Sequence, residues 1–285
     1  MKRPWFRQCE NPRCPQRGDM WKTLLDTHHG VLLHNRWFCS PGCLDQVLAE
    51  SLSPLIENTR SIRETKSHRF PLGLMMLSLG LINNESLQRA LRAQQDAGKG
   101  HVGYWLQQLG VVTEPDITRV VAMQWSLPVY PVEKLNENLT WAHLLPRSLL
   151  EGFHMLPVHC TPAHNLLHVA FSYRVDYTVL YAIEQILDCR TEACIIQESY
   201  IQRALALLSQ EGRSTDELIE GPIDASTISR ETMRLAMDFA TREIRVAGCA
   251  NNIWIRLRGK DSARDLLFRW SGDESTRSLK DSPIV

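Results

Sequence analysis

The sequence predicts a modular α+β protein, and three observations lead to this prediction. Four of the eight cysteines lie in residues 1–50. A motif recurs after 30 residues within residues 71–125. The apolar pattern then changes from helical spacing to short strand-like runs in residues 144–210, and it changes again in residues 227–272. We therefore expect a cysteine-bearing finger, a tandem helical repeat followed by a small α/β unit, and a C-terminal helix with a β-hairpin.

The composition is that of a globular protein, with 44% hydrophobic and 22% charged residues over 285 positions. The formal net charge of zero argues against a chain-wide footprint for nucleic acid or membranes. The first residues, MKRPWFRQCENPRC, lack the apolar core of a secretory signal. The longest apolar run, residues 70–82, is too short to span a membrane. We expect a cytoplasmic protein with reduced cysteines.

The first element is built around two cysteine pairs. Four residues separate Cys9 from Cys14, and three separate Cys39 from Cys43. Two such pairs supply the tetrahedral thiolate set of a structural Zn²⁺ and leave no open position for a catalytic water. In a reducing compartment this spacing favours zinc over a disulfide. The sequence therefore predicts a structural zinc held by these four cysteines.

Two alternatives to this zinc site remain open. Three histidines between the pairs could replace a cysteine ligand, namely His28, His29 and His34, and the four thiols could also be unrelated. The segment 38–43 resembles the FCS-type, treble-clef zinc fingers. A helix is expected to begin at Cys43, where its dipole would stabilise the thiolate.

Residues 71–125 contain one motif twice. The recurring positions of the first copy are Leu72, Gly73, Met76, Gly80, Leu87, Ala90, Leu91 and Gln94. Those of the second copy are Val102, Gly103, Leu106, Gly110, Ile117, Val120, Val121 and Gln124. A fixed period of this length marks a supersecondary unit that buries its apolar face against its neighbour.

Each copy is expected to form two helices. The first helix should end at Gly80 or Gly110. The second should begin at Asn83 or Asn84 in copy one, and at a capping box from Thr113 in copy two. In residues 144–210 we expect strands at 153–159, 166–171 and 192–197, and helices at 175–187 and 199–208.

Polar segments at residues 51–69 and 211–226 are predicted to be linkers, and residues 273–285 a tail. The domain between the linkers is residues 70–210. The last domain is expected to begin with a helix over residues 229–246 and to end in two short strands.

The doubled motif resembles the amino-terminal domain of type II secretion and type IV pilus assembly ATPases. It is closest to the tandem cyclic-di-GMP-binding version in the MSHA pilus ATPase, and the resemblance covers residues 70–210. Residues 227–272 are interpreted as a relic of the second amino-terminal domain of these ATPases, or as an unrelated helix and hairpin. The sequence has no Gly-x4-Gly-Lys-Ser/Thr loop to hold nucleotide phosphates, so we predict that it is not an enzyme.

The resemblance implies a cyclic-di-GMP site on the repeat. Glycines would let the ligand approach the backbone, and helix N-termini suit its phosphates. The implied residues are Leu72, Gly73, Met76, Gly80, Leu87, Ala90, Leu91, Gln94, His101, Val102, Gly103, Leu106, Gly110, Ile117 and Gln124. The family has an arginine before each Leu-Gly, but Pro71 and His101 occupy those positions here. Losing two bidentate contacts to guanine would cost up to roughly 6 kcal/mol. Arg69 and Lys99 lie two residues upstream.

Three functions remain in competition. The first is a non-catalytic regulatory or scaffold protein that makes protein contacts in a secretion or pilus-type system. The second is a cyclic-di-GMP-binding effector that uses the repeat. The third, a zinc-finger nucleic-acid-binding protein, is weakened by the zero net charge.

Overall fold

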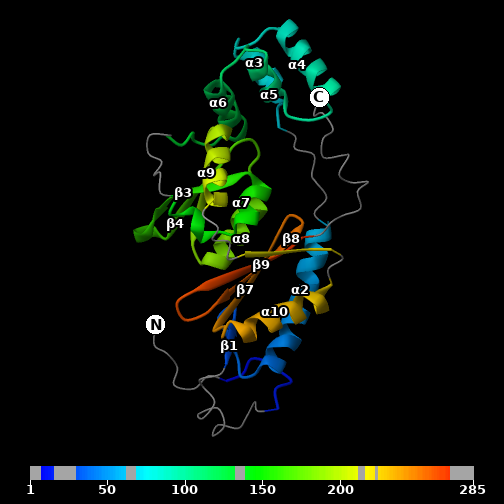
Figure 1. The fold of residues 1–285 in the computed structure, drawn as a ribbon, viewed down its shortest axis with the longest axis vertical. Helices are drawn as coiled ribbons and strands as arrows, with labels where there is room; N and C mark the ends of the chain where they lie inside the picture. The colour runs from blue at the N-terminus through cyan, green and yellow to red at the C-terminus, as the bar shows by residue number, and fades with distance from the viewer. Residues whose placement is uncertain are drawn as a thin grey trace. The chain divides into compact units, whose positions relative to one another are not determined.

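The computed structural model describes residues 8–15, 30–61, 69–131, 139–210, 216–221 and 224–269. The chain divides into two compact units (Figure 1). Unit 1 comprises Met1–Arg63, Tyr181–Asp188 and Ser214–Trp270, and unit 2 comprises Glu64–Leu180, Cys189–Arg213 and Ser271–Val285. The two sheets, the accompanying helices and an N-terminal cluster of four cysteines confirm the predicted modular α+β class.

Unit 1 is built on a six-stranded sheet of order β2-β1-β7-β8-β9-β6. Its strands are β1 (Val31–Leu33), β2 (Arg36–Phe38), β6 (Asp216–Glu220), β7 (Glu243–Cys249), β8 (Asn252–Arg258) and β9 (Ala263–Arg269). The pairs β1–β7 and β6–β9 are parallel, and the other pairs are antiparallel. Helices α2 (Pro41–Ser61) and α10 (Ala225–Asp238) pack against each other, and α2 also contacts β1, β2, β7 and β8 (Figure 1).

The structure joins two segments that the sequence analysis assigned to separate domains. The hairpin of β1 and β2, from residues 1–50, pairs with β7 in residues 227–272 through Leu32–Glu243 and Leu33–Ile244. One apolar core contains residues from both segments, including Leu44 and Phe268. The predicted finger and the predicted helix-hairpin are therefore parts of one unit.

The two predicted linkers are corrected in part. Residues 51–61 continue α2, and residues 216–220 form β6. The helix continues because its buried positions Leu44, Leu48, Leu52 and Ile56 recur at a spacing of four, and this stripe outweighs the polar residues between them. Residues 62–68, 211–215 and 222–223 lie outside the described residues.

The C-terminal segment has a shorter helix and one more strand than expected. Helix α10 ends at Asp238 rather than near residue 246, and three strands follow it. The helix ends in a Schellman-type pair of hydrogen bonds, from Ala240 N to Met237 O and from Thr241 N to Ala236 O. Ala240 occupies the left-handed position with φ +48°, where glycine is usual. An alanine there gives no sequence signal for a helix end.

Unit 2 begins with the four helices of the repeat. These are α3 (Leu72–Ser78), α4 (Asn84–Ala97), α5 (Val102–Gln108) and α6 (Glu114–Trp125). The predicted helix ends are confirmed, since Gly80 and Gly110 adopt φ +71° and +67°. Asn83 caps α4, and Thr113 forms a reciprocal capping box with Asp116.

The α/β part of unit 2 contains a three-stranded sheet of order β3-β4-β5. Its elements are η2 (Ala142–Leu144), α7 (Arg147–Phe153), β3 (Met155–Thr161), η3 (Pro162–His164), β4 (Leu166–Phe171), the start of α8 (Tyr177–Leu187), β5 (Arg190–Ile195) and α9 (Glu198–Gln210). From Tyr181 on, α8 belongs to unit 1. Strands β3 and β4 are antiparallel, and β4 and β5 are parallel. The three predicted strands and two predicted helices are present with shifts of up to two residues. In the described part of the chain, no helix has the length and apolarity needed to cross a membrane.

Candidate functional site

The four predicted cysteines meet at one point. Every pair of Sγ atoms in the set Cys9, Cys14, Cys39 and Cys43 lies within 4.8 Å. Two of these separations are 3.5 Å, for Cys14–Cys39, and 3.9 Å, for Cys39–Cys43. A tetrahedral Zn²⁺ with Zn–S bonds of about 2.3 Å holds its sulfurs about 3.8 Å apart. The cluster therefore has the ligand type and the spacing of a structural zinc site.

Asn11 fixes the loop that carries the first cysteine pair. Its side chain is only 2% exposed, and its Nδ2 donates to the carbonyl of Cys43 at 3.2 Å and to Oε1 of Gln46 at 3.1 Å. Its Oδ1 accepts from the backbone N–H of Arg13 at 2.9 Å. Asn11 is not recognisable as a site residue from its type alone. Its place between the two cysteines of the first pair is the only local signal.

The second pair lies where β2 ends and α2 begins. The hydroxyl of Ser40 accepts from the N–H of Cys43 at 3.3 Å and so satisfies a donor of the first helical turn. Burial raises the pKa of the Cys43 thiol, but hydrogen bonds from Ser40 and the neighbouring thiols outweigh it, so this pKa is below its ordinary value. Burial and hydrogen bonds with the same thiols raise the pKa of Cys39. A divalent cation would remove the cost of ionising these adjacent thiols.

The alternative histidine ligands find no support among the described residues. Nε2 of His34 accepts a hydrogen bond from the backbone N–H of Val246 at 3.2 Å, so this atom is engaged with β7. Burial, followed by the nearby Arg245 guanidinium, lowers the pKa of His34. His28 and His29 lie outside the described residues.

The two glycines that open the first helices serve helix packing. A Cβ added to Gly73 would lie 2.7 Å from Cδ1 of Leu87. A Cβ added to Gly103 would lie 3.3 Å from Cγ2 of Ile117, the equivalent residue of the second copy, and 3.2 Å from Cδ2 of Leu72. Within each copy, the missing side chain lets the two helices approach closely.

The two glutamines that recur in the motif form reciprocal hydrogen bonds between the copies. Gln94 of copy one donates from Nε2 to the carbonyl of Gly100, and Gln124 of copy two donates to the carbonyl of Phe70, both at 2.7 Å. Positions 70 and 100 are equivalent in the repeat. The helices also pair between the copies: α4 of copy one packs on α5 of copy two, and α3 of copy one packs on α6 of copy two.

The structure buries most apolar residues that the resemblance implied as ligand contacts. The buried ones are Met76, Leu87, Ala90, Leu106 and Ile117, together with Gly73 and Gly103. The partly buried ones are Leu72, Leu91, Gln94, Val102 and Gln124, and the exposed ones are Gly80, His101 and Gly110. The buried residues form the packed interior of the repeat, so only the second group and the exposed residues are open to a ligand.

An aromatic and cationic cluster includes His101, one of the two positions where the resemblance implies an arginine, and Arg69, which precedes the other by two residues. The guanidinium of Arg69 lies 3.1 Å from the ring centroid of Trp125, whose Nε1 donates to the carbonyl of Tyr173 at 2.9 Å. The ring of His101 lies 4.9 Å from that of Tyr173. Arg69 stands out in the sequence, but Trp125 and Tyr173 do not, because neither has an aromatic counterpart in the other copy or in the motif.

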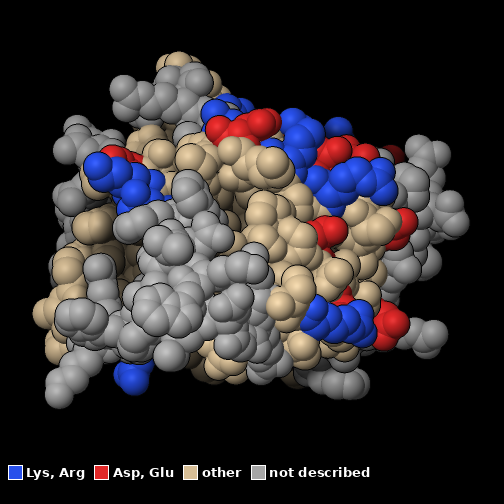
Figure 2. Space-filling model, turned by 90° about the horizontal axis from the view of Figure 1, so that it is seen from below, with Lys and Arg blue, Asp and Glu red and all other residues tan. Residues whose placement is uncertain are grey.

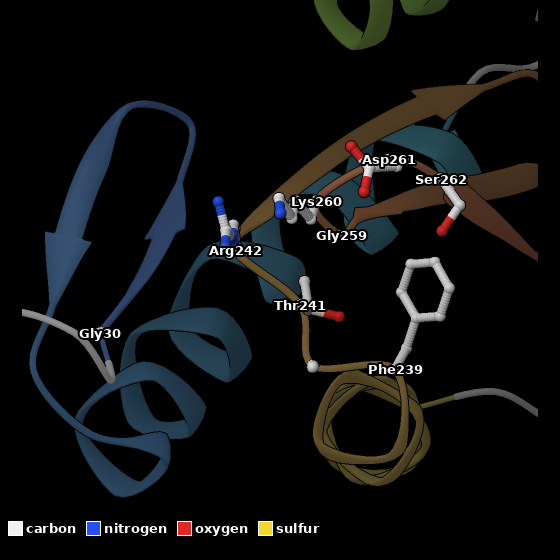
Figure 3. Close-up of a pocket in the computed structure, with 9 residues that line it drawn as sticks. Gly30, Phe239, Thr241, Arg242, Gly259, Lys260, Asp261 and Ser262 are labelled. Atoms are coloured by element: carbon white, nitrogen blue, oxygen red, sulfur yellow. The ribbon is translucent and has the colours of Figure 1, made fainter.

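A pocket of about 490 Å³ lies in unit 1 beside the loops that follow α10 and β8 (Figure 3). Its lining includes Arg242, Lys260, Asp261 and Ser262. Because side chains of both charge signs line it, the pocket does not select a ligand by charge, and we assign none. The face drawn in Figure 2 likewise carries basic and acidic side chains close together in its described part. It does not form the one-sign surface that nucleic-acid binding requires.

Among known proteins, no family model matches the chain. The chain is 24% identical over 178 residues to the type IV pilus assembly ATPase PilB of Thermus thermophilus. This match covers 58% of the chain but only 20% of PilB, so the chain spans about a fifth of that protein's length.

Two solved structures are similar to about half of the chain. A structure of MshE with cdg has a TM-score of 0.40 and 25% identity, and the match covers 49% of this chain and 99% of that one. The N-terminal domain of XpsE has a TM-score of 0.36 and 20% identity, with 47% and 91% covered. The curated relative, PilB, belongs to the group of proteins that the doubled motif resembles.

Proposed function

We propose that this chain, a relative of the amino-terminal regions of type II secretion and type IV pilus ATPases, is a non-catalytic regulatory or scaffold protein. It would make protein contacts in a secretion or pilus-type system in the cytoplasm. The reciprocal closure of the repeat is the observation that carries this proposal. The buried residues of the motif pack α3–α6, and its two glutamines hold the backbone at Phe70 and Gly100. These internal contacts support a scaffold role for the repeat.

The scaffold proposal is tested by binding of a purified pilus or secretion ATPase to this chain, measured by biolayer interferometry. We expect the ATPase to bind this chain equally well in the presence and in the absence of cyclic-di-GMP. We also expect no ATP hydrolysis by the chain alone. Hydrolysis that persists after repeated chromatography would contradict the non-catalytic assignment.

The same proposal includes a structural Zn²⁺ in the four-cysteine cluster. The spacing of the four Sγ atoms supports it. Metal analysis of freshly purified protein should find about one zinc per chain, as expected for one tetrathiolate site. Cys39→Ser should lose the metal, while Cys160→Ser, which changes a half-buried cysteine outside the cluster, should keep it. Less than about half an equivalent in the native chain would refute the tetrathiolate site.

The second candidate function is a cyclic-di-GMP effector, and the stack of Arg69 on Trp125 favours it. Arg69 precedes Pro71 by two residues in the sequence, and its guanidinium could replace the arginine that the family has at position 71. Calorimetric titration separates the two functions. Binding in the low micromolar range, about −8 kcal/mol, would support the effector, and no heat at about 100 µM ligand would leave the scaffold.

Variants decide which residues account for the result of this titration. Pro71→Arg and His101→Arg should raise the affinity if the missing arginines explain weak binding. Arg69→Ala should abolish any binding that the native chain shows. Arg92→Ala, which removes an exposed arginine from α4, is the control for a change of charge alone.

A further inference from the structure

Three residues of types that commonly bind metals, two histidines and a glutamate, form a row across the three-stranded sheet of unit 2. His159 on β3 pairs directly with His168 on β4, and His168 pairs directly with Glu192 on β5. Residues directly opposite one another on neighbouring strands project from the same face of a sheet. The three side chains therefore form one line across the sheet, and none of them takes part in the function proposed above.

The two imidazoles are close to the spacing that a shared metal ion requires. Their ring centroids lie 5.7 Å apart, with an interplanar angle of 36°. A metal ion bound at about 2.1 Å from one nitrogen of each ring would hold the centroids about 5 Å apart. The rings would have to move closer by about 0.7 Å, which a small rotation about the side-chain torsions can supply.

The backbone and the third residue favour the same arrangement. The pairing register of β3 and β4 shifts between Pro157 and His159, a bulge of the kind that redirects a side chain. Oε2 of Glu192 lies 3.6 Å from Nδ1 of His168, so the carboxylate faces one nitrogen of that ring and leaves Nε2 for a metal. Carboxylates in this position commonly orient metal-binding histidines.

The row is open to solvent. The side chain of His168 is 26% exposed, that of Glu192 is 63% exposed, and His159 is exposed. An ion can therefore reach both imidazoles, and water or a side chain from another protein can complete its coordination.

We propose that His159 and His168 form a two-imidazole binding site for a first-row divalent transition-metal ion, with Glu192 as the residue that positions His168. The site differs in chemistry from the cysteine cluster of unit 1. Thiolates select soft ions and structural zinc, whereas imidazole suits Ni²⁺, Cu²⁺ and Zn²⁺. With two protein ligands, the ion keeps open positions through which it could bridge to a partner.

Calorimetric titration with Ni²⁺ tests this site in the full-length protein after its cysteine cluster has been loaded with zinc and free metal removed. We expect one equivalent of Ni²⁺ to bind. His159→Ala and His168→Ala should each weaken this event by at least tenfold, and Glu192→Gln by roughly tenfold. His164→Ala is the matched control, because this exposed histidine lies in η3 between the same two strands and is outside the row.

A local readout identifies the bound residues independently of affinity. In the native protein, paramagnetic Ni²⁺ should broaden the ring resonances of His159 and His168 first. The proposal is overturned if the native chain binds no Ni²⁺, or if the event survives in the double variant His159→Ala/His168→Ala. It is also overturned if the event disappears only when His28 and His29 are replaced. Near-UV circular dichroism confirms that each variant remains folded.

Discussion

Gln124 donates a hydrogen bond from Nε2 to the carbonyl oxygen of Phe70 at 2.7 Å, although 54 residues separate them in the chain. The equivalent bond of the first copy, from Gln94 to Gly100, spans only six residues. The bond from Gln124 therefore connects the end of the repeat to its start, and the bond from Gln94 holds the turn between the two copies.

Replacing Gln124 with alanine should lower the free energy of unfolding of unit 2 by about 1 kcal/mol, the usual net value of one hydrogen bond. Gln94→Ala should have a similar effect. Gln108→Ala, at an exposed position at the end of α5, should change it by less than about 0.5 kcal/mol. Urea unfolding measures all three. Equal effects at positions 108 and 124 would show that the bond to Phe70 contributes nothing.

Alanine at Gly73 should destabilise the repeat by about 1–3 kcal/mol, because its Cβ would lie 2.7 Å from Leu87 Cδ1. Gly103→Ala should cost less, since its closest contact would be 3.2 Å. Gly42→Ala in α2 is the control, because nothing lies within 4 Å of the added Cβ. That change should be neutral or stabilising in thermal unfolding. Equal losses at positions 42 and 73 would argue against the packing role.

If the four cysteines hold Zn²⁺ as proposed, its removal should loosen strands more than 200 residues away in the chain. The cysteines share one core with Ile244, Ile253 and Phe268 of β7, β8 and β9. After chelation, hydrogen exchange measured by mass spectrometry should speed up in β7–β9, while β3–β5 of unit 2 serve as the internal control. Unchanged protection of β7–β9 would mean that the finger and the sheet are energetically independent.

Asp265 should be among the most sensitive positions of unit 1. Its carboxylate receives two bonds of 2.7 Å from Arg256 and one of 2.7 Å from Nε1 of Trp254, and Arg256 and Asp265 are 7% and 4% exposed. Asp265→Asn should cost about 3–5 kcal/mol, because it leaves a buried guanidinium without its counter-charge. Glu151→Gln breaks the exposed pair with Arg147 and should cost under about 1 kcal/mol. Chemical denaturation of both variants compares them, and similar midpoints would contradict the expectation.

His34 should make unit 1 less stable in mild acid. Its pKa is lowered in the folded state, mainly by burial, so the unfolded chain takes up the proton more readily. The stabilisation from the neutral ring is therefore complete above about pH 6.5 and is lost as the pH falls below that value. His34→Gln should flatten this dependence in urea unfolding between pH 7.5 and 5.5, with zinc content measured at both values.

Local signals made the repeat predictable from sequence. Gly80, Gly110, Asn83 and Thr113 mark helix ends by residue type alone, and the structure confirms each of them. The cysteine cluster was predictable for the same reason, because ligand type and spacing suffice to indicate a tetrathiolate site.

The architecture of unit 1 was not predictable, because its signals are not local. The pairing of Leu33 with Ile244 depends on two short segments that carry no common pattern. The end of α10 uses Ala240 instead of glycine. The contacts of Asn11 and the pairing of Arg256 with Asp265 also arise only once distant segments pack together.

The parallel pairing of β1 with β7 means that the chain is synthesised in an order that separates the parts of one sheet. Leu33 leaves the ribosome 211 residues before its partner Ile244. At roughly 5–20 residues per second, the β1–β2 hairpin waits about 10–40 s with an unpaired edge. During that interval neither β7 nor α10 exists to cover it, and a metal ion on the four thiols would be what holds the hairpin to the start of α2. A Zn²⁺ ion in the proposed site would therefore already contribute to the structure while the chain is being synthesised.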